Sequence, residues 1–461
     1  MLFSSIPFLY YFLPAVLILY FLAPWKLKNA VLLLSSLVFY GWGEPKLLLL
    51  MVFTIILFFF CGLAMERAGD RKQKKCWLTV SVVISLGLLG IFKYADFFIG
   101  TVNAVTGLSV PFLRLALPVG ISFYTFQCLS YTIDVYRGTV PAQKDPIAFG
   151  AYVALFPQLI AGPIVRYVDV VRELENRQTT WEDMYAGLGR FLAGLSKKVL
   201  LADSFALLVQ LYRESSEPSV VFAWLYAIAF GFQIYFDFSG YSDMAIGLGR
   251  ILGFHFIENF RYPYLSKSVA EFWRRWHMSL GSWFRDYVYI PMGGNRVSRS
   301  RWVFNILTVW MLTGLWHGAA WNFVVWGLMY ALALLAEKWI PCLQKLPSLL
   351  RHGYTMLIVI LGFVIFNAQT LSQAGDDLAA MLGMGGLPYV SAHTLYCLRS
   401  FAVLMVVACF GATPLPKTAL SRLENTRFGW IVKLFFMVAA MILCTAYLVD
   451  GSFSPFLYFR F

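Results

Sequence analysis

Long stretches without a charged residue alternate along this chain with short charged segments. The charge-free stretches are residues 1–25, 29–43, 47–65, 77–92, 115–133, 146–165, 218–236, 302–336, 352–375, 400–416 and 434–449. An α-helix needs about 20 apolar residues to cross about 30 Å of hydrocarbon. Because several stretches are shorter than this, we expect tilted or re-entrant helices among them, and about ten to twelve crossings in total.

The charges between these stretches predict the orientation in the membrane. Residues 66–75 form the densest basic segment, and they should be cytoplasmic because Lys and Arg gather in cytoplasmic loops. Lys26 and Lys28 lie two charge-free stretches earlier, so they should be on the same cytoplasmic side, as their charge also predicts. The N-terminus is then outside. Residues 417–433 are basic, whereas residues 370–394 carry acidic side chains and no Lys or Arg. The C-terminus is therefore predicted to be extracytoplasmic as well.

The composition of the 461 residues supports the membrane assignment. Hydrophobic residues make up 60% of the chain and charged residues only 13%, against about 45–50% and about 25% in soluble domains. This excludes the soluble classes of protein. The net charge of +13 is explained by basic cytoplasmic loops, so nucleic acid is not expected as a partner. The seven cysteines are scattered without a C-x-x-C pair, so we predict no disulfide framework and no metal site.

Two central segments, residues 167–217 and 238–301, are too polar for plain membrane spans, yet they are rich in aromatic residues. Such segments are typical of amphipathic helices that lie in the membrane interface or surround an internal cavity. We find no internal repeat and no separate soluble domain. The chain is therefore expected to be one integral-membrane domain over residues 1–461.

The most informative polar run is residues 270–296, AEFWRRWHMSLGSWFRDYVYIPMGGNR. Its polar residues recur every three to four positions, which predicts one helical face, and tryptophan and phenylalanine fill much of the rest. Arg274, Arg275 and Arg285 lie on this face, and arginine is well suited to binding phosphate or carboxylate. An interfacial anchor that contacts lipid headgroups is an equally good interpretation.

The second run is residues 313–327, TGLWHGAAWNFVVWG. Its His317 follows Arg301 by a distance of about 22 Å along a helix, short of the far side of the hydrocarbon core. His317 is therefore expected inside the membrane, beside a helix break that Gly314 and Gly318 permit. A titratable group at this depth favours a function over a purely structural hydrogen bond. Because desolvation favours the neutral imidazole, it could act as a general base.

Other candidate residues are weaker. His277 ranks second among the histidines, and His255, His352 and His393 lie near loops or span ends. The carboxylates in the sequence YFDFSGYSDMAIG could orient a histidine, hold a helix break or pair with Arg250, and we favour a structural role for both; they are Asp237 and Asp243. No hydrolase elbow, phosphate-binding loop or zinc-protease motif occurs.

Taken together, these runs resemble the membrane-bound O-acyltransferase (MBOAT) family, and within it the bacterial alginate O-acetyltransferase branch. The chain order of the matching stretches is the order of that branch. They are Leu117–Gly138, Phe156–Tyr167, Ile234–Phe254, Glu258–Ser268, the run 270–296, GLWHGAAWNF and the C-terminal FSPFLYFRF. The resemblance implies an all-α polytopic bundle, with re-entrant and interfacial helices around a central tunnel.

The resemblance also implies a reaction and its residues. The histidine of the family's W-H-G motif corresponds to His317, the presumed catalytic base, and the histidine of its R-W-H motif corresponds to His277. The acyl donor would be cytoplasmic acetyl-CoA, with no bound cofactor. The expected donor-binding residues are Arg274, Arg275, Arg285 and Trp276, and the expected supporting residues are Trp316, Asn322, Asp237 and Asp243.

In this branch the acetyl group passes to a periplasmic SGNH-type transferase that modifies an exported polysaccharide, in the inner membrane of a bacterium. Membrane lipid is the other expected partner. Peptidoglycan O-acetylation and D-alanyl transfer remain alternatives within the family. A proton-coupled transporter would instead use intramembrane carboxylates, which residues 302–336 lack, and a scaffold would need neither histidine.

Overall fold

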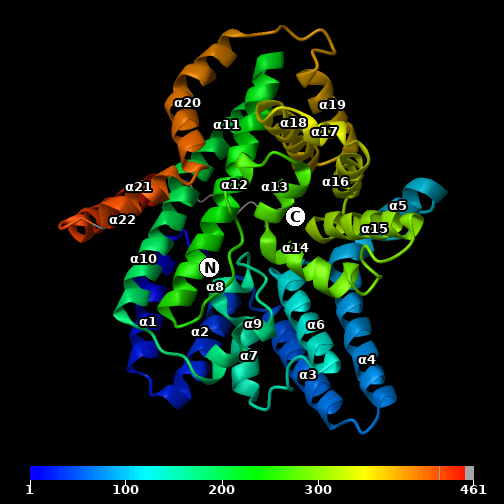
Figure 1. The fold of residues 1–461 in the computed structure, drawn as a ribbon, viewed down its shortest axis with the longest axis vertical. Coiled ribbons are helices and arrows are strands. Elements are labelled where there is room, and N and C mark those ends of the chain that lie inside the picture. Colours follow the sequence, from blue (N-terminus) through cyan, green and yellow to red (C-terminus); the bar gives the residue numbers. More distant parts are fainter. Residues whose placement is uncertain (425, 452–461) are drawn as a thin grey trace. The chain divides into compact units, whose positions relative to one another are not determined.

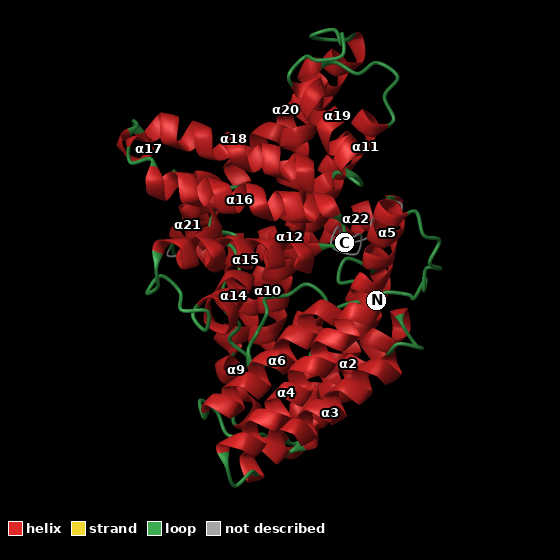
Figure 2. Ribbon diagram, turned by 90° about the vertical axis from the view of Figure 1, so that its right-hand side faces the viewer, coloured by secondary structure: helices red, strands yellow, loops and turns green. Residues whose placement is uncertain are grey.

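The computed structural model describes residues 1–424 and 426–451, and over these ranges every regular element is a helix (Figures 1 and 2). This confirms the predicted all-α class. The C-terminal stretch FSPFLYFRF lies outside the described residues. Two compact units are present, residues 1–191 with 244–257 and residues 192–243 with 258–461. Helices α10 and α12 each contribute residues to both units.

The first unit contains the helices of the N-terminal part of the chain. They are α1 (Leu13–Leu22), α2 (Lys28–Gly43), α3 (Leu48–Arg67), α4 (Arg71–Leu89), α5 (Ala95–Thr106), α6 (Ile121–Arg137), α7 (Pro146–Ala154), α8 (Phe156–Leu159), α9 (Tyr167–Glu175) and most of α10 (Trp181–Ser196). A phenylalanine cluster, in which Phe8 and Phe39 are completely buried, packs the N-terminal segment against α2 and α8. Asp70 begins α4 by accepting a hydrogen bond from the backbone N–H of Gln73.

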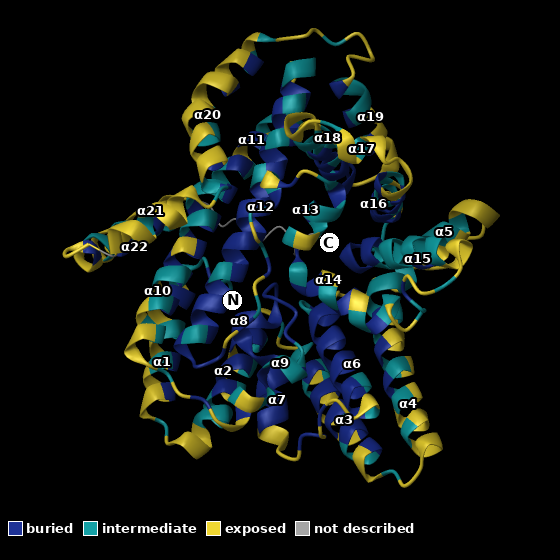
Figure 3. Ribbon diagram, viewed as in Figure 1, coloured by how far each residue is buried: buried dark blue, intermediate teal, exposed yellow. Residues whose placement is uncertain are grey.

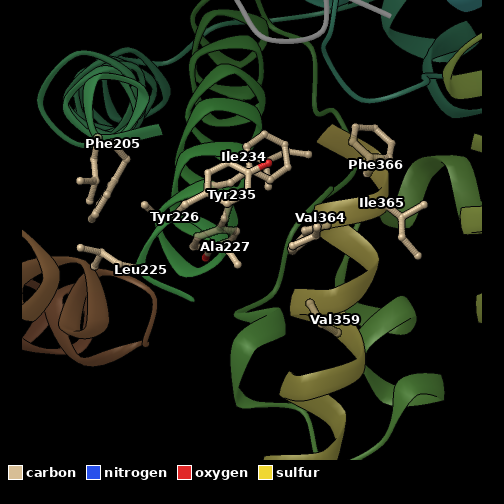
Figure 4. Packing of buried hydrophobic residues seen from close by; sticks show 14 of the residues in the cluster. Phe205, Leu225, Tyr226, Ala227, Ile234, Tyr235, Val359, Val364, Ile365 and Phe366 are labelled. Carbon is tan, nitrogen blue, oxygen red and sulfur yellow. The ribbon is translucent and has the colours of Figure 1, made fainter. Parts of the chain in front are cut away.

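The second unit contains the remaining helices. They are α11 (Asp203–Arg213), most of α12 (Val220–Ile251), α13 (Val269–Arg275), α14 (Met278–Phe284), α15 (Arg299–His317), α16 (Trp321–Trp339), α17 (Cys342–Lys345), α18 (Ser348–Asn367), α19 (Leu371–Met381), α20 (Ala392–Gly411), α21 (Leu415–Glu424) and α22 (Gly429–Asp450). Its core is built on α12 and α18, whose apolar residues face one another (Figure 4). Tyr235 of α12 and Val364 of α18 belong to this core.

Several helices expose apolar side chains, as expected for a protein surrounded by lipid. Along α20 and α22 most residues are exposed (Figure 3), among them Val403 and Phe435. Six helical segments are long and apolar enough to cross a membrane: Leu48–Arg67, Arg71–Thr106, Val220–Ile251, Ser348–Asn367, Ala392–Gly411 and Gly429–Asp450. The protein is therefore a multi-pass membrane protein, while ten to twelve crossings and the sidedness of the termini stay predictions.

The predicted helix break at His317 is confirmed. Helix α15 ends at His317 and α16 begins at Trp321, so the charge-free run 302–336 forms two helices. A Cβ built on Gly314 would lie 2.1 Å from the carbonyl oxygen of Phe323, and one built on Gly327 would lie 2.2 Å from that of Trp310. Because both pairs are symmetric about residues 318–319, the two helices form a tight antiparallel hairpin with His317 at its tip.

Two expectations about the polar segments are wrong. Residues 238–251 do not form a helix separate from the apolar stretch before them but continue α12, whose carboxylates Asp237 and Asp243 pair with Lys198 and Lys197. The run 270–296 is not one helix either, since it breaks at His277 between α13 and α14. The backbone of His277 is left-handed, with φ of 46°, and an α-helix cannot pass through such a residue.

The hairpin makes a prediction about stability. Gly314→Ala should destabilise the protein by about 1–3 kcal/mol, because the new methyl group would overlap the Phe323 carbonyl unless α15 and α16 move apart. Thermal unfolding in detergent measures the effect. Gly353→Ala in α18 is the matched control, since nothing lies within 4 Å of its Cβ, and it should leave the melting temperature unchanged or raise it. Equal melting temperatures for the two variants would contradict the close approach.

Candidate active site

His317 lies at the C-terminal end of α15 in an aromatic enclosure. Its side chain is buried, and its ring centre lies 5.1 Å from those of Trp316 and Trp326 and 5.2 Å from that of Phe366. Gly318 follows in an extended conformation, so the chain leaves the helix directly after the histidine. The hairpin thus places the imidazole among rings that exclude water from three sides.

His277 occupies the break between α13 and α14 and is also buried. Its ring lies edge-on to that of Phe238, with centres 4.7 Å apart. Its Nδ1 atom lies 3.1 Å from Oδ1 of Asn259. Burial lowers the pKa of His277 from 6.5 to about 3, because desolvation penalises the charged imidazole. This histidine is therefore neutral at physiological pH.

The structure brings the two predicted histidines together. The ring centres of His277 and His317 are 6.4 Å apart, and Trp316 contacts both rings, at 5.7 and 5.1 Å. Trp316, predicted as a supporting residue, therefore packs against both histidines. The pair of imidazoles in an apolar, aromatic setting can remove and return a proton without a permanent charge.

Asn322 and Trp276, two further predicted residues, help to build the enclosure. Nδ2 of Asn322 donates to the carbonyl oxygens of Ile365 and Ala368, at 3.3 and 2.8 Å. This fixes the end of α18, from which Phe366 reaches His317. Trp276 is 4% exposed and packs into the core against Phe260, Phe272 and Phe363. Its position is that of a packing residue next to His277.

The three predicted arginines lie on the polar side of this region. Arg274 and Arg285 are exposed, and Arg275 is partly exposed. Arg275 pairs with Glu271 at 2.8 Å and Arg285 pairs with Asp286 at 2.7 Å. Exposed guanidinium groups on α13 and at the end of α14 are available to an anionic ligand, although each of these carboxylates competes for one of them.

Asp237 and Asp243 form ion pairs with lysines. Lys198 lies 2.9 Å from Asp237 and 2.7 Å from Asp203, and Lys197 lies 2.6 Å from Asp243. Burial acts to lower the pKa of Lys198, but the two carboxylates outweigh it and raise that pKa, so the ammonium group stays charged. Arg250, an alternative partner, pairs with Asp183 instead. These contacts support the structural role favoured for both aspartates.

The other histidines have separate partners. His255 pairs with Glu173 at 2.8 Å and is largely exposed. Nδ1 of His352 lies 3.1 Å from the carbonyl oxygen of Ser266, and Nδ1 of His393 lies 3.3 Å from Oγ of Ser215. Among residues 1–424 and 426–451, no group of three or more His, Cys, Asp or Glu side chains is placed to hold a metal ion.

Sequence reasoning missed Asn259, which is completely buried and contacts His277. The residue lies inside the matching stretch Glu258–Ser268, so its position in a motif was a signal, but nothing in the sequence linked it to a histidine. Lys198 was missed as well, because a buried lysine inside an aromatic segment cannot be paired with Asp237 before the helices are placed.

Comparison with known proteins adds a family and several relatives. The family model for membrane-bound O-acyltransferases matches residues 34–372. A protein of Azotobacter vinelandii named probable alginate O-acetylase AlgI is 41% identical over all of both chains. The peptidoglycan O-acetyltransferase of Helicobacter pylori is 32% identical over 84% of this chain and 81% of the relative. The teichoic acid D-alanyltransferase of Bacillus subtilis is 29% identical over 54% of this chain and 69% of the relative.

The lowered pKa of His277 predicts a pH dependence of stability. Between pH 6.5 and about 3 the unfolded chain binds a proton at this residue and the folded protein does not. Acidification below pH 6.5 therefore removes about 1.4 kcal/mol of stability per pH unit, which His277→Gln would not lose. Melting temperatures at pH 7.5 and 5.5 measure the difference. His255→Gln, at an exposed site, should behave like the wild type, and an equal drop in all three proteins would refute the assignment.

Proposed function

This chain belongs to the membrane-bound O-acyltransferase family, and we propose that it passes acetyl groups from cytoplasmic acetyl-CoA across the membrane, where an extracytoplasmic polysaccharide is O-acetylated. Membership of the family makes the protein a membrane-bound acyltransferase. The single observation that carries the proposed chemistry is the buried pair His277 and His317, with ring centres 6.4 Å apart.

The proposed reaction needs a base in a dry site. An acceptor hydroxyl attacks the thioester carbonyl carbon, the new C–O bond forms, and the C–S bond to CoA breaks. His317 takes the proton from the hydroxyl as it attacks and returns it to the leaving thiolate, which departs as CoA thiol. His277 either positions a reacting group or stabilises developing charge, and which of these roles it can take depends on which ring nitrogen carries its proton. The surrounding rings of Trp316, Trp326 and Phe366 support this role, because they exclude water that would hydrolyse the thioester.

We propose that the exposed arginines bind the phosphates of the donor. Guanidinium groups match phosphate oxygens in pairs of hydrogen bonds. Arg274 is exposed, and Arg285 is exposed as well but would have to exchange its ion pair with Asp286 for the phosphate. The donor would enter from the cytoplasmic side and the acceptor from outside.

An alginate-like polysaccharide is the preferred final acceptor. The relative named alginate O-acetylase matches this chain from end to end at 41% identity, whereas the peptidoglycan O-acetyltransferase is 32% identical. D-alanyl transfer is the weaker alternative, because that relative covers about half of the chain. A periplasmic SGNH-type transferase would carry the acetyl group to the polymer, in the inner membrane of a bacterium.

His317→Ala should abolish acetylation of the polymer in cells, with loss of about 100-fold or more of the rate, because the hydroxyl then lacks its base. Acetyl content of the purified polymer is the measurement, with protein abundance checked in the same membranes. His352→Ala is the matched control, since this histidine bonds to a loop carbonyl, and it should retain activity. Unchanged acetylation in His317→Ala would favour a scaffold or transporter instead.

Arg285→Ala should raise KM for acetyl-CoA about tenfold and change kcat little, because it removes a phosphate contact made equally in the ground and transition states. Steady-state rates of CoA release by the protein in lipid vesicles give both constants. Arg67→Ala, in the basic segment 66–75, removes the same charge elsewhere and should leave KM unchanged. If KM for acetyl-CoA rose in both variants, the cause would be a general effect of charge rather than a donor site.

A further inference from the structure

Asn259 is a hydrogen-bonding centre beneath the catalytic pair. It is 0% exposed, and its Oδ1 atom lies 3.2 Å from the backbone nitrogen of Ser279, 2.9 Å from Oγ of Ser279 and 3.1 Å from Nδ1 of His277. Its Nδ2 atom donates to Oγ of Ser242 at 3.0 Å. Its own carbonyl oxygen accepts from the backbone N–H of Met278 at 2.9 Å. One residue thus binds the three consecutive positions 277–279.

The orientation of the Asn259 amide follows from these partners. The backbone N–H of Ser279 can only donate, so the atom that faces it must be the amide oxygen. A flipped amide would set two N–H groups against each other. Oγ of Ser279 also lies 3.4 Å from Nδ1 of His277, but it donates its one proton to Oδ1 over the shorter distance of 2.9 Å. Since Oδ1 faces Nδ1 of His277 at 3.1 Å and can only accept, we assign the proton to that ring nitrogen.

We propose that Asn259 is a positioning residue that fixes His277 as the Nδ1–H tautomer, and so leaves Nε2 as a bare hydrogen-bond acceptor in a ring whose centre lies 6.4 Å from that of His317. The inference rests on the proposed function for the use of this acceptor, but not for the tautomer itself. Nε2 of His277 is buried and has no hydrogen-bond partner among residues 1–424 and 426–451.

Backbone geometry gives Asn259 a second role at the same place. His277 is the N-cap residue of α14, yet its side chain makes no capping bond, and its φ of 46° is unfavourable for a residue other than glycine. Asn259 instead accepts the hydrogen bonds that the backbone N–H groups of Met278 and Ser279 donate at the start of α14. Such strain persists only where the surroundings enforce it, and here Asn259 supplies that constraint.

The tautomer narrows the role of His277. A neutral imidazole with a bare Nε2 cannot donate a hydrogen bond from that atom to the oxygen of a thioester carbonyl, so stabilisation of an oxyanion is excluded for it. Nitrogen atoms of the two rings can approach no closer than about 4 Å with centres 6.4 Å apart, which is beyond the hydrogen-bond range of about 2.7–3.2 Å. A hydroxyl of the acceptor could bridge the two rings, and His277 would then orient it by accepting its hydrogen bond.

Nitrogen NMR of the full-length protein in lipid, with ¹⁵N-labelled histidine, tests the tautomer directly. The signals of His277 are identified by their loss in His277→Gln. We expect a protonated Nδ1 and an unprotonated Nε2, and in Asn259→Ala a mixture of both tautomers. A protonated Nε2 in the wild type would overturn the proposal. This readout requires no enzymatic activity.

Kinetics test the consequence. Asn259→Ala should lower kcat about 10–100-fold and leave KM for acetyl-CoA within about twofold, as for other residues that orient a functional histidine. In a double-mutant cycle, His277→Ala/Asn259→Ala should be no slower than His277→Ala alone, because Asn259 acts through His277. Additive losses would contradict this.

A matched control separates positioning from stability. Asn305 is another completely buried asparagine, which donates to the carbonyl oxygens of Met292 and Gly294. Asn305→Ala should lower the melting temperature and leave kcat unchanged, and equal losses of kcat in both variants would refute a specific role for Asn259. If the Asn259→Ala protein fails to accumulate, the NMR assignment of the His277 tautomer in the wild type tests the proposal by itself. Full activity of His277→Ala together with the Nδ1–H tautomer would refute the proposed use of His277 but leave the tautomer assignment standing.

Discussion

The site depends on one constraint: backbone N–H groups at the start of a buried helix must find acceptors, because water cannot reach them. Two short helices flank His277, and each is capped by a side chain from another segment. Glu337 of α16 accepts from the N–H groups of Val269 and Ala270 at the start of α13, at 2.6 and 3.0 Å. At the start of α14, the main-chain carbonyl oxygen of Asn259 accepts from the N–H of Met278, and its side-chain Oδ1 accepts from that of Ser279. The break that presents His277 is stable because both helices beside it are anchored.

Helix α16 contacts both of the helices that end at or next to the two histidines, α13 and α15. Glu337, near its C-terminal end, fixes α13, while its N-terminal end packs against α15 in the hairpin that carries His317. Buried charged groups, like buried N–H groups, are paired with a partner inside the protein. Lys198 is buried together with Asp237, and Arg213 pairs with Asp377 at 2.7 Å. In this setting a neutral imidazole needs no counter-ion, which is consistent with the proposed use of histidine at the centre of the site.

A feature of this fold could be predicted from the sequence where its cause lies within one segment of the chain. The break at His317 could be predicted, because the glycines and the depth along the helix are properties of one segment. The break at His277 could not be predicted, since the run 270–296 has good helical periodicity and its interruption requires Asn259 from another segment. The length of α12 was missed for the same reason: Asp237 looks like the end of a membrane span until Lys198 is placed beside it.

The names of the relatives imply different acceptors, from alginate to peptidoglycan and teichoic acid. This division is physically reasonable. In the proposed mechanism, the base and its dry enclosure act on a hydroxyl group and do not depend on what carries that hydroxyl. The choice of acceptor would then be made outside the aromatic enclosure. Within the site, the tautomer of one histidine sets only the direction of a single hydrogen bond, and that direction suits any alcohol.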